Sequence, residues 1–258
     1  MDEGGVIGKL AHGLKAGSGT LTAWIGANDV AVVDALAREA YDAVTLDMQH
    51  GGVDFVGATR GIMAVALAGK PAIVRIPVGE FALASRLVDA GAAAIIAPMI
   101  NSGEDARRFV EHTKFPPIGG RSWGPRAALS LSGYIGPAYL HSANAITLSI
   151  AMVETRQALD ALDDILTTPG IDGVFVGPSD LSIALSGGAL VDAHGAEVDA
   201  ALSHVIERTR AHNKFAGLFC IDGARAKGAL ARGFALATVS TDLVLLRAAA
   251  RQELAAAR

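Results

Sequence analysis

Short apolar segments with the composition of buried β-strands alternate with helical patterns along nearly the whole chain. The segments predicted as strands are residues 21–25, 43–48, 72–76, 93–97, 146–153, 174–176, 215–220 and 235–239. Helical patterns follow these segments, and Asn28-Asp29 supplies capping residues for the first of the helices. Strand–helix units repeated eight times predict a (β/α)8 barrel, the TIM barrel fold.

The main alternative is an open, doubly wound α/β sheet, which usually has fewer strands. The end of the first predicted strand and the residues after it, 24–29 with the sequence WIGAND, lack the glycine-rich fingerprint that binds dinucleotides in such sheets. A length of 258 residues suits one barrel, and neither a linker nor a change of composition divides the chain. We therefore predict a single α/β domain over residues 1–258.

Two further helices are predicted at the ends of the barrel sequence. Residues 6–16 form an amphipathic pattern that Gly17-Ser18-Gly19 ends. Residues 242–257 carry apolar side chains on more than one helical face, whereas an outer barrel helix needs only one apolar stripe. The second pattern predicts contact with another subunit and hence a homo-oligomer.

Composition excludes several classes of partner. The net charge is −4 at pH 7 and no basic run is present, which argues against nucleic acid. The longest uncharged apolar run, residues 90–100, is too short to span a bilayer. Residues 1–5 lack the pattern of a signal peptide, and Cys220 is the only cysteine, so no internal disulfide can form. We therefore expect a cytoplasmic protein without a membrane partner.

Residues 115–144 interrupt the strand–helix alternation. This stretch is rich in proline and glycine, contains no clear strand and includes Arg121, Tyr134 and Tyr139. An irregular segment of this length in a compact domain is usually functional. We therefore expect it to help select the substrate.

Two carboxylates follow consecutive predicted strands. Glu154 and Asp180 each lie where an apolar run ends and a helical pattern begins, 26 residues apart. If the two strands are parallel neighbours, both carboxylates lie at the same edge of the sheet, where they could bind a hard divalent cation. The alternative is that both acids only cap the helices that follow them.

Other chemically active residues follow further predicted strands. His50 belongs to the run Asp47-Met48-Gln49-His50-Gly51, and Asp242 follows the last strand. Arg75 interrupts an apolar run, so it is either part of the site or a structural ion-pair partner of Asp47. Gly177-Pro178-Ser179 opens a helix whose free N–H groups could hold a carboxylate or phosphate, although Ser179 could equally be a simple cap.

The positions of the lysines argue against one mechanism. A Schiff-base aldolase needs a lysine at a strand end inside the barrel. Lys70 and Lys214 precede predicted strands, and Lys9, Lys15, Lys114 and Lys227 lie on predicted helices or near the N-terminus. The sequence therefore disfavours imine chemistry, and a carbanion formed here would need a metal as its electron sink.

Seven short motifs carry a resemblance to a known family. They are residues 46–51 (LDMQHG), 74–77 (VRIP), 87–92 (LVDAGA), 98–99 (PM), 116–121 (PPIGGR), 152–155 (MVET) and 176–182 (VGPSDLS). In this order they resemble the HpcH/HpaI aldolase family, the metal-dependent class II pyruvate aldolases. The resemblance extends from Leu21 to Ala250.

The resemblance implies an enzyme that cleaves or forms 4-hydroxy-2-oxo acids through the enolate of pyruvate, with an aldehyde as the second substrate. Glu154 and Asp180 would hold Mg²⁺, Mn²⁺ or Co²⁺. Arg75 would bind the keto oxygen, and His50 would move protons together with Asp89, the latter from a neighbouring subunit. Pro178, Ser179, Asp180 and Gln49 would contact the substrate. Family members are typically hexamers that exchange the last helix, so we expect a hexamer here.

One position departs from the family pattern, and other activities are compatible with the same residues. Gln49 stands where the family usually has glutamate, which removes a negative charge near the expected metal. A citrate-lyase-β-like enzyme acting on a CoA ester and an oxaloacetate decarboxylase could use the same metal site. A non-catalytic barrel that binds a small anion is the alternative outside enzymes.

Overall fold

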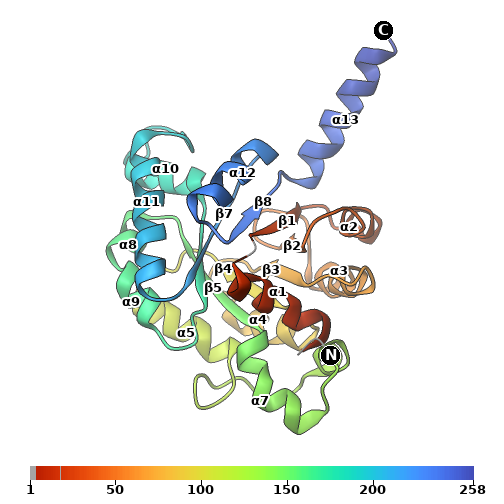
Figure 1. The fold of residues 1–258 in the computed structure, drawn as a ribbon, viewed down its shortest axis with the longest axis vertical. Helices are drawn as coiled ribbons and strands as arrows, with labels where there is room; N and C mark the ends of the chain where they lie inside the picture. The colour runs from red at the N-terminus through yellow and green to blue at the C-terminus, as the bar shows by residue number, and fades with distance from the viewer. Residues whose placement is uncertain (1–3, 18) are drawn as a thin grey trace.

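Eight parallel strands form a closed barrel in the computed structural model, which describes residues 4–17 and 19–258 (Figure 1). Strand order follows the sequence, and β8 pairs with β1 to close the barrel. The strands are β1 (Thr20–Ile25), β2 (Ala43–Asp47), β3 (Ala72–Arg75), β4 (Ala94–Ala97), β5 (Leu148–Val153), β6 (Gly173–Val176), β7 (Phe215–Leu218) and β8 (Leu236–Thr238). Each of them overlaps a segment predicted as a strand, so the predicted (β/α)8 barrel is confirmed.

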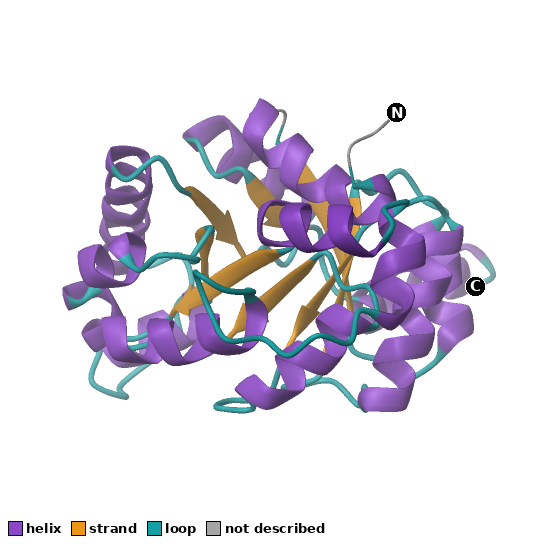
Figure 2. Ribbon diagram, turned by 90° about the horizontal axis from the view of Figure 1, so that it is seen from below, coloured by secondary structure: helices purple, strands orange, loops and turns teal. Residues whose placement is uncertain are grey.

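Helices surround the barrel on its outer side (Figure 2). They are α1 (Gly5–Ala16), α2 (Val30–Ala37), α3 (Phe55–Leu67), α4 (Phe81–Asp89), α5 (Gly103–Thr113), α6 (Arg126–Ser132), α7 (Gly136–Ile146), α8 (Arg156–Asp160), α9 (Leu162–Thr167), α10 (Pro178–Leu185), α11 (Ala196–Ala211), α12 (Gly223–Arg232) and α13 (Asp242–Ala256). Residues 1–3, on which the signal-peptide prediction partly rests, and Ser18 lie outside the described residues.

Successive strand residues face opposite sides of the barrel wall and contribute to two apolar clusters. Ile73 and Ile96 belong to the cluster inside the barrel, whereas Val74 and Ile95 belong to the cluster between the wall and the outer helices. This follows from the two-residue repeat of a β-strand, because both faces of a barrel strand are covered. It explains why the strands appear in the sequence as continuous apolar runs.

The helix α1 covers the end of the barrel where the strands begin. Its buried residues Ile7, Leu10 and Leu14 join the cluster inside the barrel, together with Phe115 and Tyr139. The end of α1 is marked by Gly17 in the left-handed conformation, with φ 68°. The opposite end of the barrel is thereby left as the open end, where the strands reach their carboxyl termini.

The structure corrects the expectation of an irregular stretch over residues 115–144. Two helices, α6 and α7, occupy much of it, and α7 extends to Ile146, so that β5 begins at Leu148 and not at Ile146. Pro137 lies in the first turn of α7, where its missing N–H costs no hydrogen bond, and Gly133 ends α6 with φ 69°. The helix predicted after β5 is also divided, into α8 and α9, at Ala161.

The helix α13 projects away from the barrel (Figure 1). Asp242 is the one buried residue of this helix, and apolar side chains along its length are exposed, including Leu243, Leu246 and Leu254 at 56, 65 and 56%. None of the helices in the described part of the chain combines the length and the apolar character needed to cross a membrane. The assignment of all 258 residues to one domain stays a prediction.

Candidate active site

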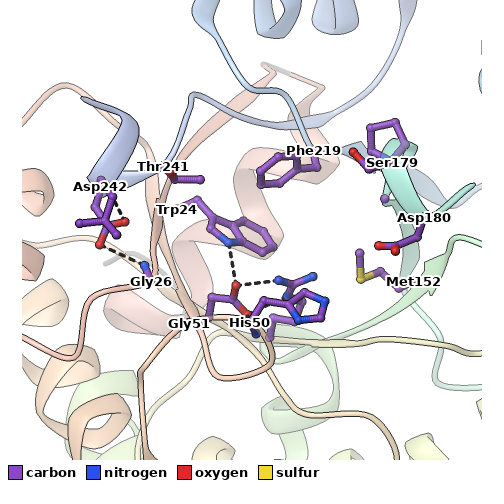
Figure 3. Close-up of a pocket in the computed structure, with 15 residues that line it drawn as sticks. Trp24, Gly26, His50, Gly51, Met152, Ser179, Asp180, Phe219, Thr241 and Asp242 are labelled. Carbon is purple, nitrogen blue, oxygen red and sulfur yellow. Dashed lines mark hydrogen bonds and ion pairs between the residues drawn. The ribbon is translucent and has the colours of Figure 1, made fainter. Parts of the chain in front are cut away.

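A cavity of about 350 Å³ opens at the carboxyl ends of the strands (Figure 3). Seven of the eight strands, all except β4, contribute to it through their last residues or the loops that follow them, as is general for this fold. Its lining consists of Trp24, Gly26, Asp47, His50, Gly51, Arg75, Met152, Gly177, Pro178, Ser179, Asp180, Phe219, Thr241, Asp242 and Leu243. The structure brings together at this cavity five residues that were predicted from the sequence, namely His50, Arg75, Pro178, Ser179 and Asp180.

Arg75 and Asp47 form a buried, two-pronged ion pair between the ends of β3 and β2. Arg75 Nε donates to Asp47 Oδ1 at 2.9 Å and Nη2 donates to Oδ2 at 2.6 Å. Trp24 adds a hydrogen bond from Nε1 to Asp47 Oδ2 at 3.2 Å, and its ring lies 4.9 Å from Arg75 Cζ. The predicted ion pair therefore exists, and it lies in the wall of the cavity, so it can serve structure and chemistry together.

The Asp47 carboxyl is held in its charged form. Burial raises the pKa of this carboxyl, but the hydrogen bonds and positive charge of Arg75, with the N–H groups of Gln49 and His50, outweigh burial and lower the pKa. Both Arg75 and Asp47 are more than nine-tenths buried. A permanent charge pair thus fixes the direction of the guanidinium at the cavity wall.

The loop after β2 carries His50 and folds tightly over Asp47. Asp47 Oδ1 accepts the N–H of Gln49 at 3.0 Å and that of His50 at 3.3 Å. A Cβ on Gly51 would lie 2.4 Å from the Asp47 carbonyl oxygen, so only glycine fits this turn. His50 is exposed to the cavity, whereas Gln49 is half-buried and does not line it, and its buried Oε1 has no hydrogen-bond partner among the described residues.

Glu154 and Asp180 lie at the ends of neighbouring parallel strands. Val153 of β5 is paired with Val176 of β6, which confirms the expected placement at one edge of the sheet. Burial raises the pKa of Glu154, the N–H of Met99 lowers it, and the negative charge of Asp180 raises it again. The pKa of Glu154 is raised on balance, because burial and the charge of Asp180 outweigh the Met99 N–H and the positive charge of Arg75.

The donor atoms of this pair suit a hard divalent cation. Met99 N–H donates to Glu154 Oε1 at 2.8 Å, while no described residue donates a hydrogen bond to Oε2. A Cβ on Gly177 would lie 2.9 Å from that Oε2, so this glycine leaves room beside the free oxygen. Within residues 4–17 and 19–258, no cluster of three or more His, Cys, Asp or Glu could hold a metal. Two carboxylates alone would leave positions for water and substrate, as magnesium-like ions require.

Comparison with known proteins identifies the family. The sequence profile described as HpcH/HpaI aldolase/citrate lyase matches residues 21–249. The chain belongs to this family.

Named relatives of this aldolase cover almost the whole chain. It is 42% identical to a hydroxypyruvate/pyruvate aldolase of Rhizorhabdus wittichii, over 94% of this chain and 95% of that one. It is 32% identical to a 2-keto-3-deoxy-L-rhamnonate aldolase of Klebsiella pneumoniae, over 95 and 91%. A crystal structure of an HpcH/HpaI aldolase/citrate lyase family protein from Burkholderia cenocepacia superposes with a TM-score of 0.88, at 32% identity over 97 and 99% of the two chains. The protein is therefore an aldolase, a carbon–carbon lyase.

Asp89 of the aldolase lies away from this cavity. It ends α4, which runs antiparallel to the strands and therefore finishes at the end of the barrel where β4 begins. Its carboxylate accepts a hydrogen bond from Arg121 Nη2 at 2.5 Å, and Arg121 is buried. Burial raises the pKa of Asp89 more than Arg121 and Arg126 lower it. Within one chain Asp89 cannot reach the cavity.

The lysines of the aldolase also lie away from the cavity. All six belong to the described residues and none lines it. Lys114 is fully buried, but its Nζ donates to the carbonyl oxygens of Asn144 and Thr147 and to Asp172 Oδ2, at 2.8, 2.6 and 2.7 Å. Burial lowers the pKa of Lys114, although Asp172 opposes this. The structure thus supports the prediction that no lysine forms an imine with the substrate.

Several residues of the site were not predicted from the sequence. Trp24, Met152 and Phe219 form an apolar wall of the cavity, and the ring centroids of Trp24 and Phe219 are 5.2 Å apart. Met99 contributes only a backbone N–H, which its left-handed conformation, with φ 55°, directs at Glu154. An aromatic residue at the end of a strand could have indicated the wall, whereas a backbone donor leaves no signal in the sequence.

Proposed function

We propose that this aldolase forms and cleaves 4-hydroxy-2-oxo acids through the enolate of pyruvate, with Glu154 and Asp180 holding a divalent cation such as Mg²⁺, Mn²⁺ or Co²⁺. The observation that carries the proposal is that Asp180 lines the same cavity as the fixed guanidinium of Arg75, while the buried carboxylate of Glu154 follows the neighbouring strand. When bound, the cation supplies a Lewis acid for the keto oxygen of the substrate. Both acids are oxygen donors, which hard cations prefer.

Arg75 would stabilise the charge that develops on the keto oxygen when a methyl proton of pyruvate is removed. Its Nε and Nη2 are occupied by Asp47, whereas no described residue accepts a hydrogen bond from Nη1. Asp47 holds the guanidinium plane in place before the substrate arrives. A donor that is already oriented stabilises the enolate without having to reorganise during the reaction.

His50 would hold and move the proton, because its imidazole is exposed to the cavity and is fixed at its backbone by Asp47. We propose that Asp89 assists it from a neighbouring subunit, since this acid lies at the far end of its own barrel. The backbone N–H groups at the start of α10, around Ser179 and Asp180, would hold the carboxylate of pyruvate. Gln49 would contact the substrate only after its side chain turns toward the cavity.

A CoA ester is a poorer substrate for this cavity than a small oxo acid. CoA carries several phosphates and needs an exposed basic groove. Arg121, one of two arginines that could supply such a groove, is buried beside Asp89, and neither Arg121 nor Arg126 lines the cavity. The cavity volume of about 350 Å³ suits pyruvate with a small aldehyde.

We also propose that the aldolase is a homo-oligomer, and specifically a hexamer, in which α13 packs on a neighbouring subunit. The exposed apolar side chains of α13 have no partner within the described part of the chain that would bury them. A long helix that buries almost none of its own surface is costly for an isolated molecule in water. Assembly would cover this helix and would bring Asp89 close to a neighbouring cavity.

The test is the exchange of pyruvate methyl protons with solvent deuterium, followed by NMR. The wild-type protein is expected to catalyse this exchange with added Mg²⁺ or Mn²⁺ and to lose it in EDTA. Glu154→Gln and Asp180→Asn should remove both the exchange and the binding of Mn²⁺ measured by calorimetry. Glu197→Gln, which changes an exposed carboxylate on α11, serves as the control and should retain both. Metal-independent exchange, or unaltered Mn²⁺ binding by both site variants, would contradict the proposal.

A further inference from the structure

Asp242 lines the cavity but takes no part in the proposed chemistry. In Figure 3, Asp242 and Asp180 lie on opposite sides of the cavity with Trp24 between them, so Asp242 does not belong to the carboxylate pair of Glu154 and Asp180. Asp242 is 5% exposed. A buried carboxylate is costly unless donors surround it, and this residue therefore requires an explanation.

The carboxylate of Asp242 binds the turn that follows β1. Oδ2 accepts the N–H of Gly26 at 3.1 Å and that of Ala27 at 2.7 Å, while Oδ1 accepts the N–H of Leu243 at 2.9 Å. Two of these donors lie more than 210 residues away in the sequence. Asp242 therefore links the start of α13 to the turn at the carboxyl end of β1.

The turn after β1 in turn supports the loop that carries His50. The carbonyl oxygen of Gly26 accepts the N–H of Gly52 at 2.8 Å. Gly51 packs so closely on this turn that an added Cβ would lie 2.8 Å from both Cα and the carbonyl oxygen of Gly26. A continuous set of hydrogen bonds and backbone contacts thus runs from Asp242 through Gly26 to the residues beside His50.

Asp242 is also the anchor of α13. It is the only buried residue of that helix, and the rest of α13 projects from the barrel (Figure 1). The backbone before it turns sharply, since Ser240 has φ 62°, a left-handed conformation that is unusual for a residue other than glycine. The direction in which α13 leaves the barrel and the position of the turn after β1 therefore depend on the same side chain.

We propose that Asp242 is a positioning residue, whose buried carboxylate couples the base of α13 to the loop that holds His50. The inference rests on the proposed function where it concerns His50, and on geometry alone where it concerns the loop. Without the carboxylate, the N–H groups of Gly26 and Ala27 lose their acceptor, and the turn that supports Gly51 and Gly52 is no longer fixed.

The experiment compares Asp242→Ala, Asp242→Asn and the control Asp222→Ala. Asp222 also follows a strand and accepts a hydrogen bond from a helix N–H, that of Arg225 at 2.8 Å, but it does not line the cavity. Amide hydrogen exchange of residues 47–52 is measured by NMR or mass spectrometry. Methyl-proton exchange of pyruvate supplies kcat and KM, and calorimetry supplies the affinity for Mn²⁺.

We expect Asp242→Ala to reduce the amide protection of Gly52 and kcat by about tenfold or more, the loss expected when two backbone donors lose their acceptor. The affinity for Mn²⁺ should not change, because Asp180 lies across the cavity from Asp242 (Figure 3) and Glu154 follows the strand beside that of Asp180. Asp242→Asn retains one oxygen acceptor and should give intermediate values. If Asp242→Ala does not fold, the intermediate loss in Asp242→Asn carries the test.

Two results would overturn the inference. One is wild-type amide protection of residues 47–52 in both Asp242 variants, and the other is an equal loss in Asp222→Ala, which would indicate general destabilisation. A wild-type protein without pyruvate exchange activity would refute the proposed function instead. The amide measurement would still decide whether Asp242 supports the loop.

Discussion

Replacing Arg75 by lysine tests the role of the guanidinium while keeping its positive charge. Arg75 uses Nε and Nη2 to hold Asp47, which leaves Nη1 for the cavity. A lysine has one nitrogen and presents it as a compact charge, so it cannot hold both Asp47 oxygens and also face the substrate. We therefore expect Arg75→Lys to lose most of the turnover.

The structure sets the size of the expected effect. Loss of a single oriented donor to a developing oxyanion lowers kcat by about 10²–10³-fold, or roughly 2.7–4 kcal/mol. Loss of one of the two charged hydrogen bonds to Asp47 costs roughly 1.5–3 kcal/mol of folding free energy. The charge of lysine still faces the buried carboxylate, so the larger cost of about 3–5 kcal/mol for an unpaired buried charge is avoided.

The assay is methyl-proton exchange of pyruvate at saturating Mg²⁺, combined with calorimetric unfolding. Arg38→Lys is the matched control, because Arg38 also binds an aspartate through Nε and Nη2, at 2.8 and 2.9 Å, but on the exposed surface of α2. The control should retain wild-type turnover, since exposed ion pairs contribute little. A near-wild-type kcat for Arg75→Lys, with only its melting temperature lowered, would show that Arg75 is a structural residue and would refute the argument.

Two further predictions concern assembly and the thiol. The double variant Leu246→Glu/Leu254→Glu places charges on the exposed apolar surface of α13 and should lower both the molar mass seen by light scattering and the activity; an unchanged mass would contradict the proposed role of this helix. Burial raises the pKa of Cys220 to about 12 from 9.0, so iodoacetamide at neutral pH should label only unfolded protein. Because this pKa is higher in the folded chain, the folded state should lose stability as the pH rises above 9.0.

The sequence predicted those parts of the fold that depend on short-range patterns. The strands are buried on both sides, and their continuous apolar runs are therefore visible without knowledge of the partners. The helices α6 and α7 were missed, because glycine and proline in this segment suggest loops when their positions relative to the helix ends are unknown. Gly133 and Pro137 in fact lie at helix termini, where both residues are favourable.

The sequence predicted those residues of the candidate site whose side chains lie at strand ends, but not its backbone donor or its long-range contacts. Glu154, Asp180, Arg75 and His50 follow apolar runs, and a parallel barrel brings all such ends to one rim. The N–H of Met99 depends on a backbone dihedral angle, for which a methionine gives no signal. The contact between Asp242 and Gly26 joins residues from opposite ends of the chain, and no local pattern encodes such a pairing.

The closure of the barrel between β1 and β8 sets the order in which the protein becomes functional during its synthesis. Trp24 and Gly26 leave the ribosome early, whereas Thr241 and Leu243, on the same cavity wall, are made more than 200 residues later. Until translation passes Thr238, the edge of β1 has no β8 to pair with, and until it passes Leu243 the cavity wall is incomplete. A nascent chain therefore holds an exposed strand edge for most of its synthesis, the condition under which chaperones are needed and under which truncated products aggregate.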